Sequence, residues 1–175
     1  MGLGNNFCSL QQYGKALEHY RLAAERHTHL MPEKMVQYHV YREYLQLKQA
    51  RILVNLDRFD EARQIVSTSG QVLVTKLGND HHLVAEGLLV FGRLCTLCGN
   101  YAQAHLLLQR SKEMFLISFS EDHPVMVELM QAMADNMRLP GYYEDAVFEE
   151  GNAMKLSASL FGQNTCHIGY ALYLR

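Results

Sequence analysis

Two kinds of short motif carry residue types that can bind a metal ion. Cys95 and Cys98 have the spacing of half a zinc site, and the segments 80–82 and 122–124 place histidine beside aspartate. A structural zinc ion takes four ligands, usually from two such pairs. The chain has no second closely spaced cysteine pair, and His105 lies beyond a predicted turn. We therefore interpret both cysteines as small residues that face a seam between helices, and we expect no metal and no cofactor.

The histidines of the two motifs are better explained as helix caps. His81 and His123 each follow an aspartate and precede a segment with helical periodicity, and Pro124 stands where a first helical residue tolerates proline. In each motif the aspartate or the histidine can accept a hydrogen bond from the first turn of the following helix. Because the two motifs lie on successive loops, roughly one repeat apart, we favour capping over a metal or catalytic role for these histidines.

The elements that position these residues repeat along the chain. The tetrapeptide Tyr-Ala-Gln-Ala at 101–104 has counterparts at 13–16, 59–62 and 143–146. The residue numbers of their final alanines differ by 46, 42 and 42 (Ala16, Ala62, Ala104, Ala146). Turn segments that begin at Leu77, Phe119 and Phe161 recur with the same 42-residue period. A fixed period of this size indicates a solenoid, in which each unit buries its apolar face against its neighbours.

We predict a single repeat domain over 1–175. Its units are a partial repeat at about 1–32, full repeats at about 33–80, 81–122 and 123–164, and a partial repeat at 165–175. One predicted helix ends near Leu30, six more span 33–56, 59–76, 82–98, 101–119, 124–138 and 142–160, and a last one starts at His167. Gly70 lies inside a predicted helix, which we attribute to a close backbone approach. Because the first and last units look incomplete, we expect the intact protein to be longer.

Composition and charge exclude several classes of protein. The net charge is −2, so no broad attraction to nucleic acid is expected. Hydrophobic residues make up 49% of the chain, but no uninterrupted run approaches the roughly 18 apolar residues of a membrane span. The N-terminal residues lack the pattern of a secretory signal, and the four cysteines suggest no disulfide framework, so we expect a cytoplasmic (intracellular) protein. Neither a phosphate-binding glycine loop nor a nucleophile–base pair is recognisable, so we do not expect an enzyme.

The units resemble tetratricopeptide repeats. In the third unit the residues that match the family pattern are Leu88, Phe91, Gly92, Cys95, Gly99, Tyr101, Ala104, Leu108 and Ser111. The 42-residue period, with Leu-Gly-x-Asp-His or Asp-His-Pro between hairpins, looks like the narrower kinesin light chain type. The resemblance implies an all-α fold, a right-handed superhelical solenoid of antiparallel helix hairpins.

The same resemblance implies that the first helices of successive hairpins line a concave groove that binds a peptide. Mapped by the 42-residue step, the candidate groove residues are Leu47, Arg51, Glu86, Leu89, Val90, Arg93, Glu128, Gln131 and Asp135. Arg51 and Arg93 hold one repeat position, so they should project from neighbouring helices. Their guanidinium groups could hold an acidic peptide or a C-terminal carboxylate. Alternatively, they pair with Glu86 or with other carboxylates of the chain itself.

The leading hypothesis for function is therefore a protein-interaction scaffold whose ligand is a peptide or a partner helix. The residues with which the family's chaperone-tail clamps and kinesin light chains bind their ligands are not matched here, since Leu47, Val90 and Ala132 stand at such positions. Two alternatives remain open. The chain could be an accessory helical domain of a larger enzyme, such as a SET and MYND methyltransferase, or a structural module that self-associates through its open ends.

Overall fold

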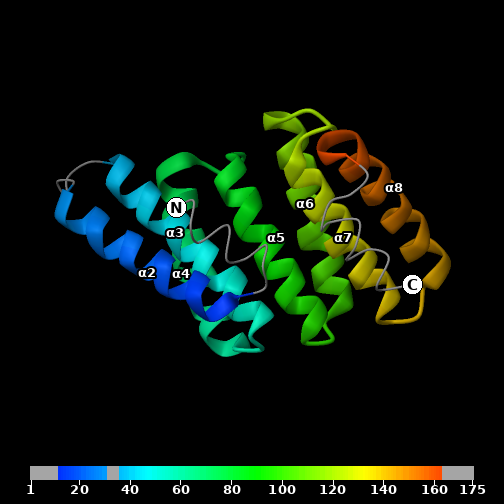
Figure 1. Ribbon diagram of the computed structural model, residues 1–175, viewed down its shortest axis with the longest axis horizontal. Coiled ribbons are helices and arrows are strands. Elements are labelled where there is room, and N and C mark those ends of the chain that lie inside the picture. Colours follow the sequence, from blue (N-terminus) through cyan, green and yellow to red (C-terminus); the bar gives the residue numbers. More distant parts are fainter. Residues whose placement is uncertain (1–11, 31–35, 163–175) are drawn as a thin grey trace.

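The structure is a computed structural model that describes residues 12–30 and 36–162. All regular structure in these residues is helical, and Figure 1 shows the helices side by side in a row. The helices are α2 (Tyr13–Leu30), α3 (Val36–Asn55), α4 (Phe59–Leu77), α5 (His82–Leu97), α6 (Tyr101–Ser118), α7 (Pro124–Arg138) and α8 (Tyr143–Phe161). The ends of α4 to α8 lie within one residue of the predicted ends. The predicted helix from His167 and the segment before Gln12 lie outside the described residues.

The turns within the hairpins follow the repeat closely. Asp57, Gly99 and Gly141 all have positive φ angles, of 57°, 78° and 102°, and they hold one position of the 42-residue period. The next residue in each turn donates its backbone N–H to a carbonyl five residues earlier, at 2.8–2.9 Å (Arg58 to Leu53, Asn100 to Cys95, Tyr142 to Met137). This is the Schellman arrangement that ends a helix in the left-handed region. Aspartate tolerates that region better than most side chains, which explains how Asp57 replaces the glycine.

Helices consecutive in the chain pack as pairs. α3 packs against α4, α5 against α6 and α7 against α8, and the first helices of these pairs also contact one another, α3 with α5 and α5 with α7. The four alanines that define the period are all buried (Ala16, Ala62, Ala104, Ala146). The chain is therefore all-α and repeat-like over the described residues, and the predicted period is confirmed.

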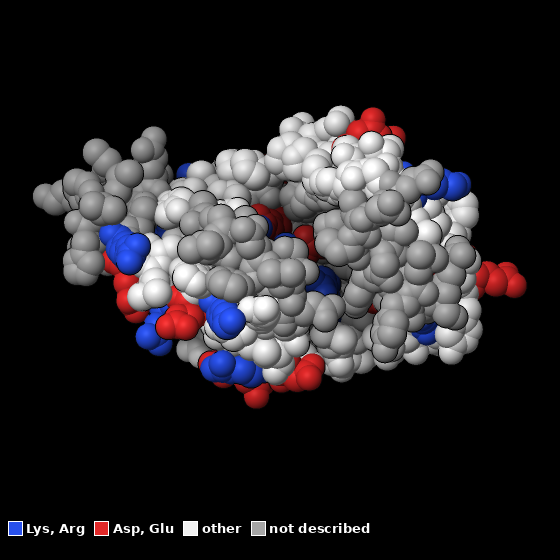
Figure 2. All heavy atoms as spheres, in the orientation of Figure 1, with Lys and Arg blue, Asp and Glu red and all other residues white. Residues whose placement is uncertain are grey.

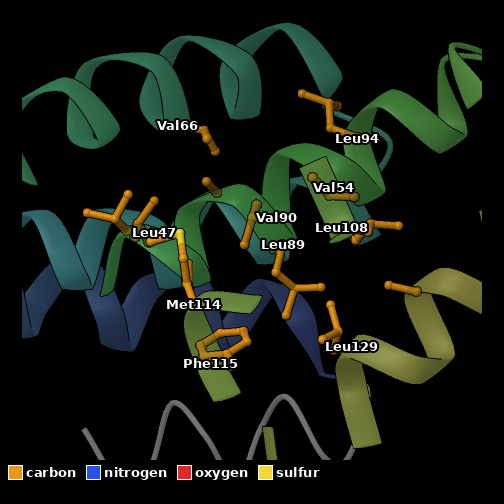
Figure 3. Close-up of a cluster of buried hydrophobic side chains, with 14 of the residues drawn as sticks. Leu47, Val54, Val66, Leu89, Val90, Leu94, Leu108, Met114, Phe115 and Leu129 are labelled. Carbon is orange, nitrogen blue, oxygen red and sulfur yellow. The ribbon is translucent and has the colours of Figure 1, made fainter. Parts of the chain in front are cut away.

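The core is continuous along the row of helices. One cluster of buried side chains runs from α3 to α7, and Figure 3 shows part of it. Phe115 and Met114 of α6, Leu89 and Leu94 of α5 and Leu129 of α7 are among its fully buried members. The apolar side chains shared by successive hairpins thus fix the positions of α3, α5 and α7 relative to one another.

Two helical glycines differ in the space around them. A Cβ atom at Gly92 of α5 would lie 2.8 Å from Cγ and Cδ2 of Leu108 of α6, so the absence of a side chain allows α6 to approach closely. A Cβ atom at Gly70 would meet nothing within 4 Å. The close approach predicted at Gly70 is therefore wrong, and a close approach of two helices occurs at Gly92 instead.

A buried polar pair connects the third and fourth hairpins. Thr96 Oγ1 of α5 donates to Asn136 Oδ1 of α7 at 3.0 Å, and Asn136 Nδ2 donates to the backbone carbonyl of Tyr101 at 3.2 Å. Both side chains are buried, so these hydrogen bonds replace the water that the polar atoms lose on folding. The pair also fixes the register of α7 against α5 and α6, since a shift of α7 along its neighbours would leave these polar atoms unsatisfied.

Candidate functional site

The first helices of three hairpins bring ionisable side chains together. We call this set the charged strip; it consists of Lys48 and Arg51 of α3, Glu86 and Arg93 of α5, and Glu128 and Asp135 of α7. All six residues are half-buried. Figure 2 shows basic and acidic atoms close together in a hollow near the middle of the molecule. The packing of α3, α5 and α7 in sequence places these side chains within reach of one another.

Arg51 and Arg93 converge on a single carboxylate. Arg51 Nη1 lies 2.7 Å from Glu128 Oε2, and Arg93 Nη1 lies 3.6 Å from Glu128 Oε1. Arg93 Nη2 also donates to Asn55 Oδ1 at 3.3 Å. The two arginines therefore project from neighbouring helices as predicted, and the alternative in which they pair with carboxylates of the chain is the one observed. Their partner is Glu128 of α7, the first helix of the following hairpin.

Glu86 has a different cation. It forms an ion pair with Lys48, whose ammonium group also lies 4.9 Å from the ring centroid of Tyr44. Burial lowers the pKa of Lys48, but the Glu86 carboxylate and Tyr44 outweigh that effect, so that the pKa of Lys48 is raised. Lys48 was missing from the predicted site, although its position one turn before Arg51 on α3 would have indicated it.

Two further charged residues, Arg138 and Glu150, lie beside the charged strip at its α7 end. Arg138 forms an ion pair with Asp135 and a second one with Glu150 of α8, where Nη1 and Oε1 are 2.6 Å apart. Burial raises the pKa of Asp135, and the nearby Arg138 and Arg93 only partly oppose this effect. The spacing of three residues between Asp135 and Arg138 was a signal for the first pair.

Three of the nine predicted groove residues do not lie at the surface. Leu47, Leu89 and Val90 are buried in the core cluster. The methyl groups of Leu47 lie against α5 at Gly87, 3.7 Å from the position that a Cβ atom would take there. These three side chains are therefore buried rather than exposed along a groove, and Leu47 points into the contact between α3 and α5. Gln131 is half-buried on α7, beside the charged strip.

The histidines of the two aspartate–histidine motifs cap helices. Nδ1 of His81 accepts from the backbone N–H of Leu83 at 3.1 Å, and Nδ1 of His123 accepts from that of Val125 at 3.2 Å. The predicted capping role is thus confirmed, with histidine as the acceptor in both turns. Asp80 instead forms an ion pair with Arg110 at 2.7 Å.

The two cysteines of the Cys-x-x-Cys motif lie in different environments. Cys95 is buried, and this burial raises the pKa of its thiol. Cys98 is exposed, and Arg63 Nη2 donates to its sulfur at 3.7 Å. The prediction that both face a helix seam is correct for Cys95 and wrong for Cys98, which lies at the exposed hairpin turn. Within residues 12–30 and 36–162, no group of three or more His, Cys, Asp or Glu side chains is arranged to hold a metal ion.

Large apolar side chains also lie exposed on the second helices. Leu106 of α6 and Phe148 of α8 hold one repeat position and are each 70% exposed, and Val147 stands beside Phe148. Leu106 is exposed although α7 and α8 follow it in the row. Phe148 is therefore exposed because of its position within the repeat, and not because α8 is the last described helix.

The described helices include none that is both long and apolar enough to cross a membrane. In comparisons with known proteins, no family model matches the chain, and no curated protein matches it.

Proposed function

We propose that this chain is a protein-interaction scaffold of the tetratricopeptide type, a right-handed superhelical solenoid that binds a peptide or a partner helix along α3, α5 and α7. The 42-residue spacing of buried alanines and Schellman turns supports the repeat class. The proposal assigns the ligand to the charged strip, because the first helices of three hairpins meet there.

One observation carries the assignment of the ligand. Arg51 and Arg93 come from different hairpins, yet both reach the carboxylate of Glu128. Two guanidinium groups around one carboxylate make a site with a shape and charge that suit any carboxylate. A carboxylate side chain or C-terminus of a ligand would replace Glu128, whose side chain is 22% exposed and able to turn toward solvent. Glu128 therefore acts as an internal competitor.

This proposal predicts opposite effects for the two sides of the ion pairs. Glu128→Gln should strengthen the binding of a labelled oligoglutamate peptide by about tenfold, because the internal competitor loses its charge. Arg51→Glu or Arg93→Glu should weaken it by about tenfold or more, since a charged hydrogen bond is worth about 1.5–3 kcal/mol. Fluorescence anisotropy at low salt measures both effects, with an oligolysine peptide as the control for ligand charge.

Arg63→Glu provides the matched control for charge reversal, because Arg63 is exposed on α4 and lies outside the charged strip. Circular dichroism shows whether each variant is folded. Equal peptide affinities for the wild type, Glu128→Gln and the Arg51/Arg93 double variant would contradict the assignment of the ligand to the charged strip.

Self-association is a second candidate function, favoured by the exposed Leu106, Val147 and Phe148. It predicts that the sedimentation coefficient rises with protein concentration and that Phe148→Ser removes this rise. Arg63→Glu, which leaves the apolar positions intact, should self-associate like the wild type. A sedimentation coefficient that stays constant across the concentration range would exclude this candidate.

A further inference from the structure

Four rings from two loops lie together at the N-terminal ends of α5 and α7. We call His81, His82, Phe119 and His123 the histidine latch. The rings of His81 and His82 stack with centroids 4.2 Å apart, and His82 meets the edge of Phe119 at 5.3 Å. Phe119 in turn stacks on His123 at 4.0 Å, with an interplanar angle of 11°. The histidine latch thus joins the turn before α5 to the turn before α7.

The two caps in the histidine latch require neutral imidazole rings. His81 and His123 each accept a backbone N–H through Nδ1. A neutral histidine has one ring nitrogen that accepts, whereas a protonated histidine has two donors and no acceptor. Protonation therefore replaces each cap with two N–H groups that face each other. It also brings a positive charge to a helix N-terminus, where the helix dipole disfavours it.

The charged groups around the histidine latch do not offset the loss of the caps on protonation. Asp80 is held by Arg110, and Glu86, which faces His82 from its own helix, is held by Lys48. Glu121 and Asp122, in the turn before His123, are exposed.

The surroundings of His82, including the other two histidine rings, also disfavour its protonation. Burial lowers the pKa of His82, His81 and His123 act in the same direction, and Glu86 opposes them. A cation over the face of Phe119 gains about 0.5–1 kcal/mol, which at most offsets one lost cap.

We propose that the histidine latch is a pH-sensitive device, closed when its rings are neutral and released on acidification, which frees the first turns of α5 and α7. Because both caps require neutral imidazole rings, acidification destabilises the closed histidine latch. Burial lowers the pKa of His82 in the folded chain, so the contribution of His82 to stability is present above about pH 6.5, the ordinary pKa of histidine, and is lost as the pH falls below that value. Glu86 and Glu128 of the charged strip lie directly after these first turns, in the second turns of α5 and α7.

Hydrogen exchange measured by NMR tests this proposal at the bonds concerned. Between about pH 7.5 and about pH 5, the protection factors of the Leu83 and Val125 amides should fall about fivefold, the equivalent of a cap worth about 1 kcal/mol. The amides of Ala62 and Ala104 serve as references, because they bond to backbone carbonyls at helix starts that have no side-chain cap. Their protection factors should change much less.

Asparagine variants separate capping from titration, since asparagine caps a helix but does not titrate in this range. In His81→Asn the Leu83 amide should keep its protection at about pH 5, and in His123→Asn the Val125 amide should do so. His105→Asn is the matched control, because His105 is exposed on α6 and outside the histidine latch, and it should behave like the wild type. An equal loss of protection in wild-type and asparagine variants, or in the reference amides, would overturn the proposal.

Discussion

Replacement of Phe115 by alanine is expected to lower the free energy of unfolding by about 3–5 kcal/mol. Phe115 lies in the middle of the row of helices, on α6, and its side chain is only 2% exposed. It belongs to the core cluster that α3 to α7 share, so its loss leaves a cavity between hairpins rather than at an end. In a repeat protein, the contact between neighbouring units contributes much of the stability. Urea unfolding followed by circular dichroism measures the change.

Phe148→Ala is the matched control for this prediction. It removes the same atoms from α8, where Phe148 is 70% exposed, and should change the free energy of unfolding by less than about 0.5 kcal/mol. The comparison is made at a concentration where the wild type is monomeric. If the two variants lost the same stability, the buried position of Phe115 on α6 would be incorrect.

Gly92→Leu is expected to destabilise the fold by about 3 kcal/mol, at the upper end of the usual cost of overpacking. Even the first added carbon would lie 2.8 Å from two side-chain atoms of Leu108, which is buried in the core cluster. The remaining atoms would push α6 away from α5. Thermal and urea unfolding of the purified variant give the magnitude.

Two further variants test whether the cost of Gly92→Leu comes from the conflict with Leu108. Gly70→Leu adds the same side chain to a helix where a Cβ atom meets nothing within 4 Å, and it should be neutral or stabilising because leucine is the better helix former. Leu108→Ala should destabilise the wild type but should cost less in the Gly92→Leu background, since it removes the atoms in conflict. Additive costs of the two substitutions would show that Gly92 and Leu108 do not compete for space.

The histidine caps illustrate how far local sequence information reaches. The aspartate–histidine motifs predicted a cap in each turn but left open which residue accepts the hydrogen bond. In the turn before α5 the Asp80 carboxylate pairs instead with Arg110, which lies 30 residues away in the chain. Likewise, nothing in the spacing of His81, Phe119 and His123 indicates that their rings lie in one group, because that group forms only when successive turns pack side by side.

The sequence by itself determined the helices, their ends and the period. These features depend on interactions within a few residues, such as the positive φ at Asp57, Gly99 and Gly141 and the small residue that each hairpin needs at Ala62, Ala104 and Ala146. A pattern of this kind is repeated in each unit, so that each unit supports the prediction for the others.

Only the tertiary structure decided which side chains of the first helices reach the surface and which charges meet. Neighbouring positions on a helix are turned by about 100°, so a difference of one residue separates the buried Leu47 from the half-buried Lys48. The pairing of Arg51 and Arg93 with Glu128 depends on the distances between α3, α5 and α7. Those distances are set by the buried side chains that pack between the helices, such as Leu47 against Gly87, and no local pattern in the chain records them.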